Sequence, residues 1–344
     1  MTARTRYFAI ASLLVIGVGL GTGLVAYYVG FPARAFQNRG GPDELALVPR
    51  DATVIAYANV HDVMTSELRQ KLRSVVPIKE SGQQELQEHT GINLETDIDR
   101  IVACLDPDRT RPNSRGAGMV LARGRFDEAR IESLMRDHGA HIEEYKTKRL
   151  IVSDVWHGDD GSFSVAFIEP GLVSLGSTAL VRTAIDLHQT GNNPQAGIES
   201  VTGNEELMNL VRSLESGNAW AVGRFDALTS HAHLPDEIST RIPAITWFSV
   251  STHINGGIRG VVRAETRDEE AAANLRDVVR GFLALGKLQA GSNPQIQALA
   301  QSLALGGTGK TVSLSFDVPA ELFDIIRGLN KGDLPKEFPK PPAH

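Results

Sequence analysis

The sequence predicts an α+β fold, in which an N-terminal transmembrane helix is followed by a duplicated, mainly antiparallel sheet with helices packed on one side. Three observations lead to this prediction. A long apolar run without charges lies close to the N-terminus. Hairpin signals join several strand-like segments in the remainder of the chain, and short sequence phrases recur there in the same order.

The membrane anchor is expected at residues 7–31, a run longer than the roughly 20 residues that a helix needs to cross a bilayer. Arg4 and Arg6 precede this run, as the positive-inside rule requires for a cytoplasmic stub at residues 1–6. A cleaved signal peptide is the alternative, because residues 33–35 have a small-x-small pattern, although signal peptides carry shorter apolar runs. We therefore expect a single-pass protein of the inner membrane, bound to the lipid bilayer through this run, with most of the chain periplasmic or otherwise extracytoplasmic.

Glycines at alternate positions within the anchor are the candidate self-association residues. Gly17 with Gly21 and Gly19 with Gly23 have the G-x-x-x-G spacing that lets two helices approach closely in lipid. A homodimer is therefore one expected assembly. The alternative is that glycine is simply frequent in membrane helices.

A linker is expected at residues 32–49, where Pro32, Pro42, Pro49 and the Gly40-Gly41 pair interrupt any periodicity. The rest of the chain divides into three expected parts: a first α+β repeat at residues 50–200, a second at residues 201–330, and a Pro/Lys-rich tail at residues 331–344.

The internal repeat depends on three pairs of similar phrases in the same order. The pairs are Asp62–Ser66 with Asp226–Ser230, Asp127-Glu128 with Asp268-Glu269, and Val173–Leu175 with Val312–Leu314. A further pair, Gly124–Asp127 with Gly223–Asp226, lies at a different offset. The sequence therefore predicts the repeat and leaves its register open.

In the first repeat, residues 53–60 are apolar and rich in β-branched side chains, and they predict a strand that leads into a helix over 62–75. A helix beginning after Asp127, as its N-cap, is expected to end at Gly139. The other expected elements of this repeat are strands at 102–105, 118–123, 150–157, 163–168 and 172–175 and a helix at 178–188, and a linking helix is expected at 205–214.

In the second repeat, Asn255-Gly256 is the strongest hairpin signal and joins strands at 245–254 and 258–265. Asp268 caps a helix whose stripe is expected to be buried, and Pro294 opens another helix that ends at the glycines after Leu303. The stripe of the first of these helices consists of Leu275, Val278, Val279 and Phe282. The other expected elements are strands at 219–225 and 312–318 and a helix at 319–329.

Composition argues against nucleic-acid binding and against an intramolecular disulfide. The formal net charge is −6 without a basic cluster, so no nucleic-acid partner is expected. The chain has one cysteine, Cys104, which excludes an intramolecular disulfide. This cysteine lies in an apolar run and is expected to be a buried strand residue.

Four motifs suggest chemistry but have simpler explanations. Residues 306–311 resemble the end of a P-loop, yet the glycines follow an expected helix and precede a strand, which is the reverse of the required order. His231 and His233 lack neighbouring ligands. The aspartates at 97, 99, 106 and 108 lack the spacing of an EF-hand loop, and Trp156-His157 fits an aromatic strand end. No catalytic, cofactor-binding or metal-binding residue is therefore assigned, and no cofactor is expected.

Several phrases resemble a group of uncharacterised bacterial membrane-anchored proteins with a duplicated domain of unknown function. They include Leu47–Thr53, Thr90–Ile92 before Asp97–Arg100, Arg123–Asp127 and Leu175–Ser177. The resemblance spans most of residues 45–330 and implies location and general fold, without catalytic residues.

The anchor, the repeat and the missing active site together favour a non-enzymatic envelope protein that binds an unidentified protein partner of the cell envelope. The first alternative is an envelope protein that binds a lipid or another apolar ligand between sheet and helices. The second alternative is a divergent hydrolase that uses the scattered aspartates.

Overall fold

A computed structural model describes residues 41–75, 87, 91–93, 95–106, 117–158, 161–227, 245–290, 297 and 301–319. The predicted anchor at 7–31, the tail at 331–344 and the helix at 319–329, apart from Pro319, lie outside these residues. All structural statements below concern the described part of the chain.

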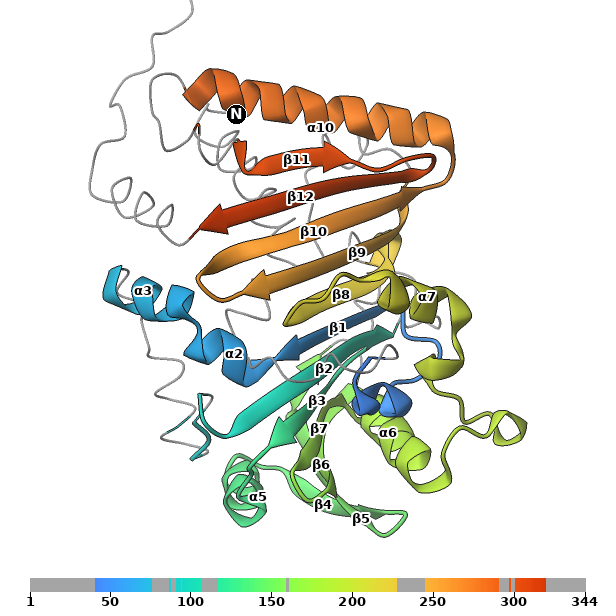
Figure 1. Ribbon diagram of the computed structural model, residues 1–344. Helices are drawn as coiled ribbons and strands as arrows, with labels where there is room; N and C mark the ends of the chain where they lie inside the picture. The colour runs from blue at the N-terminus through green and yellow to red at the C-terminus, as the bar shows by residue number, and fades with distance from the viewer. Residues whose placement is uncertain are drawn as a thin grey trace, which may run out of the picture.

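The described strands form one 12-stranded antiparallel sheet in the order β11-β12-β10-β9-β8-β1-β2-β3-β7-β6-β5-β4 (Figure 1). The strands are β1 (Val54–Asn59), β2 (Ile98–Asp106), β3 (Ala117–Gly124), β4 (His141–Tyr145), β5 (Lys148–Gly158), β6 (Gly161–Glu169), β7 (Leu172–Ser177), β8 (Ala219–Arg224), β9 (Ile245–Ile254), β10 (Gly257–Thr266), β11 (Leu303–Gly306) and β12 (Thr311–Pro319). The expected antiparallel α+β fold is confirmed at this level.

The two expected repeat regions meet at the middle of the sheet, where β1 pairs with β8. Ala56 lies opposite Ala221, and the Tyr57 ring stacks on Trp220 with centroids 5.6 Å apart. Outward from this junction, the strands follow the order β1-β2-β3-β7-β6-β5-β4 on one side and β8-β9-β10-β12-β11 on the other. The sheet therefore runs without interruption through both regions.

Helices cover both faces of the sheet, so the expectation of helices on one side is wrong. They are η1 (Asp43–Leu47), α2 (Val60–Thr65), α3 (Glu67–Val75), α5 (Glu128–Asp137), α6 (Thr178–Thr190), η2 (Pro194–Ala196), η3 (Val201–Gly203), α7 (Glu205–Ser213) and α10 (Glu269–Ala290). Ile55 and Tyr57 of β1 belong to a core cluster with α6, α7 and η1. Ala58 of the same strand faces the opposite cluster, with α2 and α3. Alternating side chains therefore give β1 two apolar faces.

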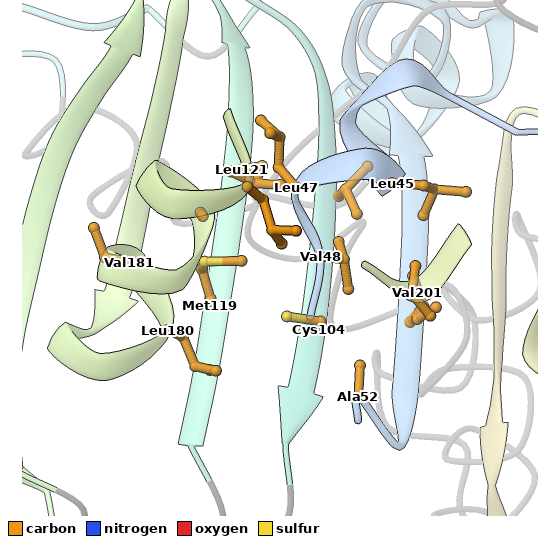
Figure 2. Packing of buried hydrophobic residues seen from close by; sticks show 14 of the residues in the cluster. Leu45, Leu47, Val48, Ala52, Cys104, Met119, Leu121, Leu180, Val181 and Val201 are labelled. Atoms are coloured by element: carbon orange, nitrogen blue, oxygen red, sulfur yellow. The ribbon is translucent and has the colours of Figure 1, made fainter. Parts of the chain in front are cut away.

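The larger core cluster includes part of the segment expected to be a linker. Leu45, Leu47 and Val48 are buried against β2, β3 and α6, and Figure 2 shows these residues together with Cys104 and Met119. The linker prediction for residues 32–49 is therefore wrong at its C-terminal end. A short turn of 3-10 helix buries these side chains, and the helical periodicity of such a short segment is too weak to predict.

Several local predictions are confirmed in detail. The Asp127 carboxylate accepts a hydrogen bond from the Arg130 amide at 3.0 Å and caps α5. Asn255-Gly256 joins β9 and β10, because Ile254 and Ile258 are the first pair of that hairpin. Cys104 is a buried residue of β2.

Three elements differ from their predictions. The helix expected over residues 62–75 breaks at Ser66, which is extended and whose hydroxyl accepts from the Arg69 amide, so α3 begins as a separate helix. β4 was not predicted, because its turn uses Lys146 and Thr147 at positive φ in place of glycine. Leu303 begins β11 and pairs with Phe316, so the helix C-cap expected after it is wrong.

Candidate functional site

Helix α10 lies alongside the end of the sheet and contacts β10, β12 and β11 (Figure 1). It begins at Asp268, whose carboxylate accepts a hydrogen bond from the Ala271 amide at 2.8 Å. Ala271 and Ala272 are buried, and the Arg276 guanidinium donates to the carbonyl oxygens of Gly309 and Thr311. These contacts fix the N-terminal half of α10 to the β11–β12 hairpin.

The C-terminal half of α10 presents an apolar face to solvent in the structure. The exposed fractions are 41% for Val278, 49% for Phe282, 53% for Leu285 and 77% for Leu288. These residues recur at intervals of three and four, so they lie along one side of the helix. The expected burial of this stripe is therefore wrong at Val278 and Phe282, whereas Leu275 and Val279 are half-buried.

The strand beneath this helix ends the sheet. β11 pairs with β12 through Leu303–Gly306, and the described residues place no strand on its outer side. The edge of such a strand carries backbone N–H and C=O groups that another chain can pair with. The apolar helix face and the sheet edge therefore lie at the same end of the molecule. We call the exposed face of Val278, Phe282, Leu285 and Leu288 the α10 face.

Charges on α10 are balanced. The acidic side chains are Glu269, Glu270 and Asp277, and the basic ones are Arg276, Arg280 and Lys287. Asp277 accepts a hydrogen bond from Arg280 at 2.9 Å, and Lys287 is exposed. The helix therefore provides no net positive charge that would attract anionic lipid headgroups.

A second candidate is a cluster of charged residues on the other half of the sheet, around the buried side chain of Glu44. The Arg100 guanidinium donates to the Glu44 carboxylate at 3.0 and 3.1 Å, and Arg123 donates to it at 2.5 Å. Arg123 also donates to Glu169 at 2.8 Å, and His188 lies 3.4 Å from Glu169. The cluster therefore joins η1, β2, β3, β6 and α6.

Burial and hydrogen bonding oppose each other in this cluster. Burial alone raises the pKa of Glu44, but hydrogen bonds from Arg100 and Arg123 outweigh it and hold the pKa below its ordinary value. The hydrogen bond from Arg123 likewise lowers the pKa of Glu169. Glu44 and Glu169 therefore each pair with at least one arginine, which is the arrangement of a structural ion-pair network.

Asp62 of α2 is a third candidate, at the junction of the two regions. Burial raises the pKa of its carboxyl, while the nearby charges of His253 and His61 and the Asn218 amide lower it. Its Oδ2 atom is buried and accepts no hydrogen bond. Among the described residues, however, no three His, Cys, Asp or Glu side chains are grouped so that they could hold a metal ion.

The structure gives the motifs considered in the sequence a structural explanation. Gly306, Gly307 and Gly309 connect two antiparallel strands, so this segment lacks the strand-to-helix order of a P-loop. Asp97 accepts a hydrogen bond from the Asn93 amide at 2.8 Å and pairs with Arg125 at 3.6 Å. Among the residues that the structure describes, Asp97 therefore has a structural role at the start of β2.

Several candidates lie outside the described residues. They are the glycines of the proposed self-association face (Gly17, Gly19, Gly21 and Gly23), together with His231, His233 and Asp108. Trp156 and His157 belong to β5, and their side chains are likewise not described. In the described part of the chain, no helix is both long enough and apolar enough to span a membrane.

The sequence did not reveal the α10 face or the Glu44 cluster. The stripe on α10 was found, but periodicity does not tell whether another element covers a stripe. Glu44 lies in a segment rich in proline and glycine, and its partners Arg100 and Arg123 come from two separate strands. Only the antiparallel register of β2 and β3, which places those arginines opposite each other, brings the cluster together.

Comparisons with known proteins give one distant structural similarity. No protein-family model matches the sequence, and a search of curated proteins finds no match. Among solved structures, crystal form I of TP0453 aligns with a TM-score of 0.43 and 9% sequence identity. The alignment covers 83% of this chain and 97% of that chain. At this level the similarity indicates nothing about function.

Proposed function

We propose that the chain is a membrane-anchored, extracytoplasmic, non-enzymatic protein that binds a protein partner of the cell envelope through the α10 face. The single observation that carries the proposal is the row of exposed side chains from Val278 to Leu288. Contiguous apolar surface on a water-exposed helix costs free energy unless a partner covers it.

The balance of charge on α10 favours a protein over a lipid surface as this partner. Helices that lie on a bilayer combine an apolar face with a polar face rich in lysine and arginine. Here Asp277, Glu269 and Glu270 offset the basic residues. Protein interfaces have this composition, with an apolar centre and a mixed polar rim.

Two further parts of the proposal are the membrane anchor and the duplication of the exported part. The uncharged run at residues 7–31 supports a single-pass inner-membrane anchor, and the resemblance to uncharacterised bacterial membrane-anchored proteins supports the same location. Duplication of the exported part is supported by the strand orders, because three consecutive strands lead outward from the β1–β8 junction on each side and the later strands follow in reverse order, four on one side and two on the other. In each half a helix capped by aspartate, at Asp127 or Asp268, follows the third strand of that half.

The two alternatives have weaker support. For a lipid carrier, the apolar sides of α6 and α7 would line a cavity, but Val181, Ile185 and Leu207 belong to the packed core cluster. For a hydrolase, an unpaired carboxylate should face a cleft, whereas Asp97 is engaged with Asn93 and Arg125, and the unpaired Oδ2 atom of Asp62 is buried. Among the described residues, neither alternative has a site comparable with the α10 face.

The test is purification of the full chain from its native membrane in mild detergent, followed by quantitative mass spectrometry. Phe282→Glu places a charge in the α10 face. Ala284→Glu is the matched control, because Ala284 is also exposed and lies about 160° away around the same helix. We expect a stoichiometric protein to be lost with Phe282→Glu and kept with Ala284→Glu. Equal recovery of all proteins with both variants would contradict the proposal.

A further inference from the structure

We infer that the segment after β12, residues 320–329, docks as a helix over Ser313, in the position that α6 takes over Ser174 in the other half of the sheet. The docking surface consists of Ser313 and Ser315 of β12 with Ala304 and Gly306 of β11, and we call it the β12 surface. This inference is independent of the α10 face. It rests on the strand register of the two halves and on the sequence beyond Pro319.

The strand register relates the two halves by an approximate two-fold axis through the Ala56–Ala221 pair. Such an axis exchanges Tyr57 with Val222, and both are buried in the same core cluster. From Tyr57, directly opposite residues lead through β2 and β3 to Ser174 of β7. From Val222, they lead through β9 and β10 to Ser313 of β12. Directly opposite residues share a face, so the two serines are equivalent positions on one face of the sheet.

The sequence supports the same equivalence. Ser174 and Ser313 are the central residues of the two Val-Ser-Leu phrases that indicated the repeat. Because the register was obtained from strand pairing alone, the phrases and the pairing are independent observations.

The two positions differ in their exposure. Ser174 is fully buried, on the face where α6 contacts β6 and β7. Ser313 is half-buried, and Ala304 and Gly306, on the same face, are exposed. Helix α5 packs on the other face, where Met135 contacts the second core cluster. Because α10 follows β10 as α5 follows β3, and such connections are right-handed, α10 belongs on that other face too.

The chain beyond Pro319 is long enough to form the missing helix. α6 has 13 residues and follows β7 directly, and residues 320–344 follow β12 directly. Three buried residues of α6 have the spacing i, i+1, i+4, and three apolar residues beyond β12 share it. They are Leu180, Val181 and Ala184 in α6 and Leu322, Phe323 and Ile326 beyond β12. On a helix, this spacing gives one apolar side.

Side-chain sizes on the two sides of the contact are complementary. In the first half, Ala166 lies opposite Ser174. In the second half, Gly306 lies opposite Ser313 and Ala304 lies opposite Ser315, so the β12 surface is made of small side chains. The segment beyond β12 carries Phe323 and Ile326 at the positions that Val181 and Ala184 hold in α6. Larger side chains on the helix therefore meet smaller ones on the sheet, as close packing requires.

Disulfide formation in the full chain tests the contact, with Cys104→Ala as background. Ser313→Cys is combined in turn with Leu322→Cys, Phe323→Cys and Ile326→Cys, and a mild oxidant is added. Leu314→Cys is the matched control, because this neighbour is also half-buried and points to the other face. We expect at least one Ser313→Cys combination to give a disulfide within one chain, and Leu314→Cys to give none.

The products are identified by mass spectrometry of digested protein whose tryptophan fluorescence is unchanged. A disulfide between two chains would overturn the inference, because a second copy would then cover the β12 surface. Equal yields with Ser313→Cys and Leu314→Cys, or no disulfide with either, would also overturn it.

A charge on the apolar side of the segment gives a second test. Ile326→Lys should accelerate maleimide labelling of Ser313→Cys at least about tenfold, because an amine buried in the contact opens it. Asp324→Lys is the control, since position 324 lies about 160° away around such a helix and should leave the rate unchanged. Equal labelling rates in the two variants would contradict the docking of this segment.

Discussion

Replacing Glu44 with glutamine tests whether the Glu44 cluster stabilises the fold. Glu44→Gln keeps the size of the side chain and removes the charge that faces Arg100 and Arg123. Removing one partner from a buried ion pair costs about 3–5 kcal/mol, because the remaining charge stays buried without compensation. The size of the loss therefore depends on how much solvent the two arginines keep.

The exposed fractions of the Arg100 and Arg123 side chains are 28% and 27%, and Arg123 retains Glu169. Partial solvation and this second partner reduce the penalty, so we expect a loss of about 2–3 kcal/mol in the free energy of unfolding. Glu199→Gln is the matched control. Its partner Arg50 is 49% exposed, so the loss there should stay below about 1 kcal/mol.

The assay is urea unfolding of the full chain in detergent, followed by tryptophan fluorescence. Trp220 is buried at the middle of the sheet and stacks on Tyr57, so its emission reports loss of the core. The two variants are compared with the parent chain under identical conditions. A loss below about 0.5 kcal/mol for Glu44→Gln, or an equal loss for Glu199→Gln, would refute the reasoning.

Three further predictions follow from the same contacts. Hydrogen bonds lower the folded-state pKa of Glu44, so its contribution to the free energy of unfolding is complete above the unfolded pKa of about 4.3 and declines as pH falls through the folded value. In urea titrations at several pH values, the stability of Glu44→Gln should therefore approach that of the parent chain in acid. Gly176→Ala should cost about 2 kcal/mol or more by thermal unfolding, because φ is +143° and a Cβ atom would lie 2.3 Å from the Gly118 oxygen; Gly191→Ala, at an open site, should cost less. Asp127→Ala should cost about 1 kcal/mol in the same assay by removing the α5 cap, and no change would contradict the capping contact.

Much of the fold was predictable because its signals are local. Asn255-Gly256 fixes a hairpin, and the alternation of Val312 and Phe316 with polar neighbours gives β12 one buried face. Asp127 and Asp268 begin helices where short polar side chains can accept backbone hydrogen bonds. The hairpin, the strand and the two helix starts each depend on a few consecutive residues, so they can be predicted from a single sequence.

What was not predictable depends on contacts between distant segments. Helices α2 and α6 pack on opposite faces of the sheet, and an apolar stripe does not encode which face it will cover. Glu44 finds its arginines only after β2 and β3 pair. An amphipathic stripe such as that of α10 looks the same whether it faces its own sheet or another molecule, so its exposure had to come from the structure.

The central claim, that protein covers the α10 face, is tested most directly by its accessibility in the native membrane. Maleimide labelling would compare Phe282→Cys with Ala284→Cys, and background from the single native cysteine should be low because Cys104 is buried. We predict that position 282 is protected, that position 284 reacts, and that both react after denaturation. Equal labelling of the two positions in native membranes would contradict the claim, because it would show that the α10 face is open to water.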